Sequence, residues 1–184
     1  MLDNEKDLII RAQKGEAECF GYLYDHYLPQ LYRYVFLKVG SKQEAEDLTH
    51  EVFLSSWQSL PGYKSKGYPF SSWLYHIARN KVIDHYRTKK IQVNIDLVDE
   101  SFFKLASTVE KDLDIAMHWA KAQTAIKKLK EEQQDVIIMR FVEDLSHKEI
   151  ADAIGKTEGA VRLIQHRALE NLRQLMDGGE TNKN

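Results

Sequence analysis

The sequence predicts an all-α protein made of two small helical domains joined by a linker, the second of which contains a helix-turn-helix. Three observations predict this fold class. Only three prolines occur among the 184 residues. Apolar residues recur at intervals of three and four, which is the spacing of one helix face. Residues that cap helices stand where these apolar patterns begin.

The first domain is predicted at residues 1–90. Between residues 16 and 37 the apolar side chains fall on one face, so a helix is expected there. Pro29 lies inside this pattern and predicts either a kink or the start of a second helix. Cys19 is interpreted as a small buried apolar residue, and a single cysteine excludes an internal disulfide.

The next two helices of this domain are separated by a loop. Ser41 with Glu44 three residues later is a capping-box pattern, so a helix is expected to begin there and to end before Gly62. Glycines and prolines predict a loop over residues 61–69, and a further helix is expected over 70–89. In that helix, Trp73, Leu74 and Ile77 are interpreted as core residues.

The second domain is predicted at residues 116–177. Residues 91–115 are acidic and contain neither proline nor glycine, and we interpret them as a linker. The helical apolar pattern resumes after them. Residues 178–184 are expected to form a flexible tail.

A helix-turn-helix is predicted inside the second domain. Ser146 with Glu149 forms a second capping-box pattern, Gly155 can adopt a positive φ at a turn, and Thr157 can cap the helix that follows. Apolar residues occur where such a motif buries its contacts: Ile150, Ala151, Ile154, Val161 and Ile164. A plain antiparallel helical hairpin remains the alternative at this point.

Charge is distributed unevenly along the chain. The net charge is −2, which argues against a protein that binds nucleic acid over its whole surface. Residues 61–92 nevertheless hold seven basic side chains and one acidic one, which indicates a local surface for a polyanion or, alternatively, a solvated basic helix end. Asp84 and Arg87 are spaced to form an ion pair within this block.

Membrane insertion and catalysis are not expected. No apolar run approaches the roughly 18–20 residues that cross a bilayer, and the acidic start is unlike a signal peptide, so a cytoplasmic protein is expected. His76 and His85 are nine residues apart and half a turn out of phase on one helix. With no metal-ligand spacing and no glycine-rich phosphate loop, the sequence predicts no metal, no cofactor and no enzyme.

Three segments carry a family resemblance: DLTHEVFLSSW (47–57), FSSWLYHIARNKVIDHYR (70–87) and EEQQDVIIMRFVEDLSHKEIADAIGKTEGAVR (131–162). The chain resembles the bacterial sigma-70 family, in particular its extracytoplasmic-function (ECF) group, over about residues 8–90 and 117–175. The resemblance implies a sigma factor that binds core RNA polymerase and directs promoter-specific transcription initiation. It also implies an anti-sigma factor as a partner.

The resemblance implies a role for each group of candidate residues. The β′ clamp helices of the polymerase would contact an acidic helix face made of Glu44, Asp47, His50, Glu51 and Leu54. The −10 promoter element would be opened and read by a basic aromatic loop and the helix after it, through Tyr63, Lys64, Ser65, Lys66, Tyr68, Arg79, Asn80, Lys81 and Arg87. The second domain would contact the polymerase β flap and read the −35 element through Lys156, Thr157, Glu158, Arg162, Leu163, His166 and Arg167.

Two other readings stay open. A one-component transcriptional regulator could use the same helix-turn-helix, with residues 1–90 as a ligand-binding or dimerisation domain. A protein-interaction module could use amphipathic helices with acidic faces. From the residues alone, the acidic stripe of Glu44, Asp47 and Glu51 could also be a solvated surface.

Overall fold

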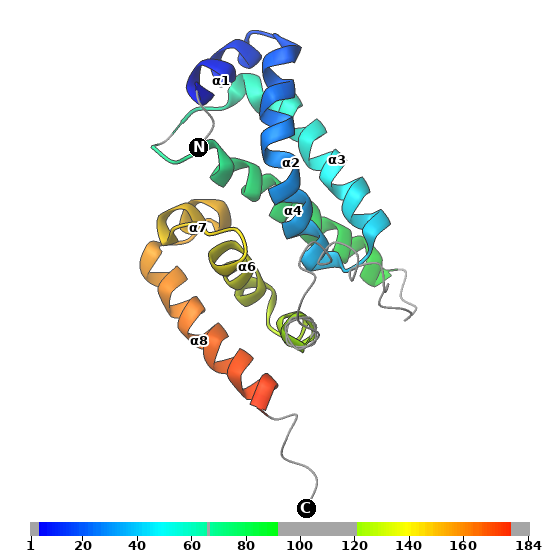
Figure 1. Ribbon diagram of the computed structural model, residues 1–184, viewed down its shortest axis with the longest axis vertical. Helices are drawn as coiled ribbons and strands as arrows, with labels where there is room; N and C mark the ends of the chain where they lie inside the picture. Colours follow the sequence, from blue (N-terminus) through cyan, green and yellow to red (C-terminus); the bar gives the residue numbers. More distant parts are fainter. Residues whose placement is uncertain (1–3, 66, 92–120, 178–184) are drawn as a thin grey trace, which may run out of the picture. The chain divides into compact units, whose positions relative to one another are not determined.

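The structure, a computed structural model, describes residues 4–65, 67–91 and 121–177 (Figure 1). Within these residues every regular element is a helix, and the chain divides into two compact units, Met1–Asp96 and Leu97–Asn184. The prediction of an all-α fold with two helical domains is confirmed. The predicted linker beyond residue 91 and the predicted tail at 178–184 lie outside the described residues.

The first unit is built around one long helix. Its elements are α1 (Glu5–Gln13), α2 (Ala17–Val39), α3 (Lys42–Ser59), the 3-10 turn η1 (Leu60–Gly62) and α4 (Phe70–Ile91). Helix α2 packs against α1, α3 and α4, and α3 also packs against α4. The turn η1 contacts both α1 and α3, so it links the first helix to the start of the loop that follows.

Helix α2 runs through Pro29 without a second start. A proline removes one N–H group, which here leaves the carbonyl of Asp25 without its helical donor. Both Pro29 and Asp25 are exposed, so water can satisfy that carbonyl. The opposite side of α2 supplies the core, where Tyr34 packs edge-on against Tyr75 of α4 with ring centroids 5.5 Å apart.

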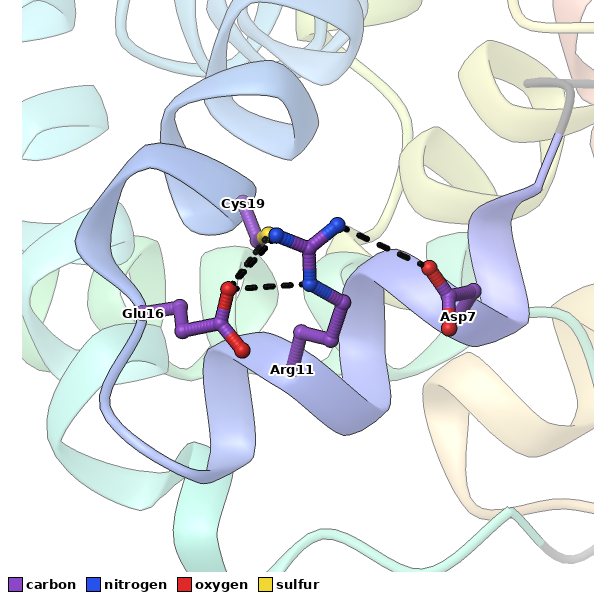
Figure 2. A network of polar contacts seen from close by, with 4 residues as sticks. All are labelled: Asp7, Arg11, Glu16 and Cys19. Atoms are coloured by element: carbon purple, nitrogen blue, oxygen red, sulfur yellow. Dashed lines mark hydrogen bonds and ion pairs between the residues drawn. The ribbon is translucent and has the colours of Figure 1, made fainter.

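Helix α1 was not predicted from the sequence. It is short and buries only Ile9 and Ala12, a pattern too brief to separate from chance. A polar network at the turn into α2 fixes it (Figure 2). The Arg11 guanidinium donates to Glu16 Oε2 from Nη2 at 2.6 Å and from Nε at 2.9 Å, and Asp7 lies 3.8 Å from Arg11 Nη1.

Cys19 lies beside this network and is buried, as expected. Its Sγ is 3.7 Å from Glu16 Oε2. Burial raises the pKa of the Cys19 thiol, because the charged thiolate loses its hydration. The hydrogen bond from Arg11 lowers the pKa of the Glu16 carboxyl.

The second unit contains a helical segment at residues 121–127, followed by α6 (Glu131–Phe141), α7 (His147–Ile154) and α8 (Glu158–Asp177). Helix α8 packs against α6 and α7. The core of the second unit is aliphatic and includes Val136, Ile138, Ile150, Val161 and Ala168. Burying each large aliphatic side chain contributes about 1.5–3 kcal/mol.

Candidate nucleic-acid interface

The turn between α7 and α8 has the local geometry that the sequence predicted. Ser146 Oγ accepts from Glu149 N at 3.2 Å, and Ser146 N donates to Glu149 Oε2 at 2.7 Å, which completes the capping box. Gly155 ends α7 with φ of 66°, a conformation that favours glycine. Thr157 Oγ1 accepts from Ala160 N at 3.2 Å and caps α8. Of the predicted apolar contacts, four are buried and Ile164 is half-buried; the buried ones are Ile150, Ala151, Ile154 and Val161. Together with the capping contacts they favour the helix-turn-helix over a plain hairpin.

The exposed face of α8 carries the predicted −35 residues. Glu158, Arg162 and His166 follow one another at intervals of four and are all exposed. Acidic side chains alternate with Arg162 and His166 along this row: Arg162 Nη2 lies 3.7 Å from Glu158 Oε2, and His166 Nδ1 lies 3.5 Å from Glu170 Oε2. Leu163 and Arg167 are also exposed. Because the pairs are on the surface, a partner can replace them at little cost.

Lys156 and Thr157 stand at the turn before α8. Lys156 Nζ lies 3.0 Å from Glu132 Oε1 of α6, so its ammonium group has an internal partner. The Thr157 hydroxyl serves as the helix cap. Gln165, on the inner side of α8, contacts His147 at 2.6 Å and ties α7 to α8.

The outer face of α3 carries four of the five predicted polymerase-binding residues. Asp47, His50, Glu51 and Leu54 are exposed, and Leu54 keeps 51% of its surface in water. Glu44 is different, because its side chain is only 28% exposed. Its backbone N–H donates to Ser41 Oγ at 3.4 Å, which is one half of the predicted capping box, while its carboxylate contacts Lys89 and His85 of α4.

Contacts between polar side chains connect α3 with α4. Lys89 Nζ lies 2.6 Å from Glu44 Oε1, and His85 Nε2 lies 3.4 Å from Glu44 Oε2. Two turns away along α3, Lys81 Nζ lies 3.3 Å from Glu51 Oε2. The predicted acidic face and the predicted basic helix therefore neutralise each other in part. His85 had no predicted role, and its four-residue spacing from Lys89 and Lys81 is the signal that could have placed it on this face.

The loop after η1 starts against an aromatic cluster. The Tyr63 ring lies 4.8 Å from the Trp73 ring and 5.3 Å from the Phe70 ring, centroid to centroid. Phe70 is buried, whereas Tyr63 and Trp73 are half-buried. The prediction of Leu74 as a core residue is confirmed, while Trp73 and Ile77 are half-buried.

The rest of the loop projects polar groups. Lys64 and Ser65 are exposed, Tyr68 is half-buried, and Lys66 lies outside the described residues. Gly67 has φ of 81°, which favours glycine at this bend.

Helix α4 then presents a row of basic and amide side chains. Asn80 is exposed and lies 3.2 Å from His76 Nε2, and Arg79 is half-buried. The predicted pair of Asp84 and Arg87 is present, with 3.5 Å between Oδ1 and Nη1. Both members are well exposed, so Arg87 can still reach a phosphate.

Across residues 4–65, 67–91 and 121–177, no helix is long and apolar enough to cross a membrane. Nor do three or more His, Cys, Asp or Glu side chains there form a group that could hold a metal ion.

Two family models match the chain in the order of its two units. The first, "Sigma-70 region 2", matches residues 23–91, and the second, "Sigma-70, region 4", matches residues 125–174. The chain is also 30% identical over 172 residues to the ECF RNA polymerase sigma factor SigD of Mycobacterium tuberculosis, covering 90% of this chain and 81% of SigD. The chain belongs to the ECF group of sigma-70 family RNA polymerase sigma factors.

A second relative of this sigma factor is the ECF RNA polymerase sigma factor BldN of Streptomyces coelicolor. The two are 35% identical over 173 residues, which is 92% of this chain but 65% of the length of BldN. A solved structure, CnrH in complex with the cytosolic domain of CnrY, matches the fold with a TM-score of 0.72 at 21% identity. That match covers 95% of this sigma factor and 97% of CnrH.

Proposed function

We propose that this sigma factor uses three separate surfaces in transcription initiation. The exposed face of α3 binds the β′ clamp helices of core RNA polymerase. The loop at residues 63–69 and the polar face of α4 open and read the −10 element. Helix α8 reads the −35 element, and the second unit contacts the β flap. The proposal rests on one observation: the first unit contains both an exposed acidic helix face and a basic aromatic loop with a basic helix after it.

The α3 face suits a basic partner helix. Leu54 provides an exposed apolar contact, and on the same face Glu51 lies about one turn before it and Asp47 two turns before it. An apolar centre with charged neighbours is the usual composition of a specific protein interface. The acidic groups would also speed encounter with a basic surface.

The loop suits single-stranded DNA. Lys64 is exposed and can contact phosphates, while the half-buried rings of Tyr63 and Tyr68 can stack with an unpaired base. Lys81 and Arg87 on α4 would then contact the backbone at the edge of the duplex.

Helix α8 suits the major groove. Its amino-terminal half exposes Arg162 and His166 on one face, and an arginine that reaches guanine O6 and N7 gives about 1–3 kcal/mol of base discrimination. Few basic groups are available along this helix, so tight binding would depend on the polymerase holding the second unit against the promoter.

The protein would act in the cytoplasm, without catalytic activity of its own, and an anti-sigma factor would hold it inactive. The exposed apolar side chains Leu54 and Leu163 support such a partner, because one inhibitor could cover both polymerase-binding units.

Reconstitution tests the proposal. Purified protein and core polymerase are incubated with fragments of genomic DNA from the organism that encodes the protein, and the transcript start sites are mapped. We expect starts that share one −35 and one −10 sequence and that require this protein. A chain that binds duplex DNA but never directs core polymerase to a start site would contradict the proposal and favour a one-component regulator.

A further inference from the structure

Gln13, the last residue of α1, is hydrogen-bonded to the backbone around η1, directly before the loop at residues 63–69. Its Nε2 donates to the carbonyl oxygen of Leu60 at 3.1 Å and to that of Tyr63 at 2.8 Å. An amide group carries two hydrogens on its nitrogen, so these two carbonyls use both of them and fix the direction of the side chain. The partly buried Gln13 therefore clamps the two ends of η1.

The clamp acts on the first residue of the loop. Tyr63 N donates to the same Leu60 carbonyl at 3.0 Å, and the Tyr63 ring rests against Trp73 and Phe70. Leu60 itself is fully buried. The backbone on both sides of η1 is thus fixed, while Lys64 and Ser65 project into solvent directly after it.

Helix α1 is itself firmly held, so Gln13 is anchored. Ile9 and Ala12 are buried, and Arg11 is bound by Glu16 at the turn into α2 (Figure 2). At the other end of α1, the Tyr27 hydroxyl donates to Glu5 Oε1. This helix precedes residues 23–91, the part of the chain that matches the region 2 family model.

We propose that Gln13 is a positioning residue for the −10 element: through Leu60 and Tyr63 it sets where the loop begins, and thereby which base the loop accepts. The proposal rests on the function proposed above for the loop. Even a small displacement of a binding group weakens its contact with the ligand, because the loop must bind the DNA base in one geometry. Loss of both hydrogen bonds should slow promoter opening about tenfold.

Two substitutions remove the clamp in different ways. Gln13→Met keeps the length of the side chain and removes both donors. Gln13→Glu keeps the shape and sets a carboxylate against two carbonyl oxygens. Gln134→Met is the matched control, because Gln134 Nε2 also donates to two carbonyl oxygens, those of Lys127 at 3.2 Å and Leu129 at 3.0 Å, in the other unit.

The experiment uses holoenzyme reconstituted with each variant. The template is a promoter mapped with the wild-type protein, together with a set that carries each base at every −10 position. Opening is followed by permanganate reactivity of unpaired thymines, base preference by transcript yield across the set, and core binding by competition with the wild-type protein. The melting temperature of each free variant reports on folding.

We expect both Gln13 variants to slow opening about tenfold and to change base preference at the −10 element, with core binding retained. Gln134→Met should leave −10 base preference unchanged. Wild-type opening and preference in both Gln13 variants would overturn the proposal, as would an equal change of preference in Gln134→Met. The double variant Lys64→Ala with Tyr68→Ala distinguishes an error in the function proposed for the loop from an error in the role proposed for Gln13. If this double variant opens promoters normally, the function proposed for the loop is wrong. If the double variant is defective while both Gln13 variants behave as wild type, only the role proposed for Gln13 is wrong.

Discussion

Lys81 Nζ of α4 lies 3.3 Å from Glu51 Oε2 of α3, and this contact joins a surface proposed for DNA to one proposed for polymerase. A lysine that is paired with a carboxylate attracts phosphate less strongly than a solvated one. The second contact, between Lys89 and Glu44, has the same effect further along the two helices. The free protein should therefore bind DNA weakly, and each surface should be easier to engage once the other has its partner.

Removing the Glu51 charge should release Lys81. We expect Glu51→Gln to bind a single-stranded −10 oligonucleotide about two- to fivefold more tightly than wild type at low salt, which matches the ~0.5–1 kcal/mol of an exposed ion pair. Fluorescence anisotropy of the free protein measures this. Glu46→Gln is the control, because it removes the same charge from an exposed pair with Lys42 inside α3. An equal gain in both variants would mean that only net charge matters.

Leu54 tests the polymerase-binding face of α3. Leu54 is the only large apolar side chain that is exposed on the described part of this helix, and Leu54→Glu replaces it with a charged one. We expect the affinity for core polymerase to fall more than about tenfold, as for a residue at the centre of an interface. Ile10→Glu is closely matched, since Ile10 of α1 is 50% exposed. Competition with the labelled wild-type protein for core polymerase gives the affinity. Loss of binding in Ile10→Glu alone would place the interface elsewhere.

Local features of the sequence predicted the helix-turn-helix well. Ser146, Gly155 and Thr157 each act through a backbone group within four residues, so their roles depend on little beyond the local chain. Contacts between distant residues could not be predicted in this way. Glu44 and Lys89 are 45 residues apart, and Gln13 and Leu60 are 47 apart, so each pair exists only because of how the helices pack. Helix α1 was missed for the related reason that its stability comes from packing against α2 and η1.

Tyr63 shows for a single residue that contacts between distant residues cannot be predicted from local sequence. Aromatic and basic residues in sequence suggest an exposed surface for bases, and Lys64 agrees with that expectation. The Tyr63 ring, however, also covers Trp73 and Phe70. Composition indicates that a segment can bind nucleic acid, but only the packing shows how much of each ring remains available.

Cys19 should react slowly in the folded protein. The thiolate is the reactive form, and burial both shields Cys19 and raises its pKa. We expect iodoacetamide at pH 8 to label the native chain roughly a hundredfold more slowly than the urea-unfolded chain, through local opening. Mass spectrometry of timed samples measures the rate. A native rate close to the unfolded rate would show that Cys19 is accessible.

The same pKa shift gives a pH dependence of stability. Because the folded thiol holds its proton more tightly than the unfolded one, its contribution is fully present below the ordinary thiol pKa of about 8.5 and is lost as the pH rises through the raised value. Urea unfolding at several alkaline pH values, followed by tryptophan fluorescence, should show this decline in wild type. Cys19→Ala should lack the part of the decline in stability that comes from the thiol. Identical declines in the two proteins would contradict a raised pKa of Cys19.

Arg162 and Lys156 should differ in what they contribute at the −35 element. Arg162 is exposed on α8, and within the part of the chain that the structure describes its ion pair is a long surface contact of 3.7 Å with Glu158, so its guanidinium can reach a base edge. Lys156 stands at the turn and is held by Glu132 at 3.0 Å. We expect Arg162→Ala to relax the preference for one −35 base pair by about 1–3 kcal/mol, and Lys156→Ala to weaken all sequences alike with a shallower salt dependence. Holoenzyme binding to a set of −35 variants at several salt concentrations separates the two effects. If Arg162→Ala weakens every sequence equally, the side chain contacts phosphate and another residue of α8 reads that base pair.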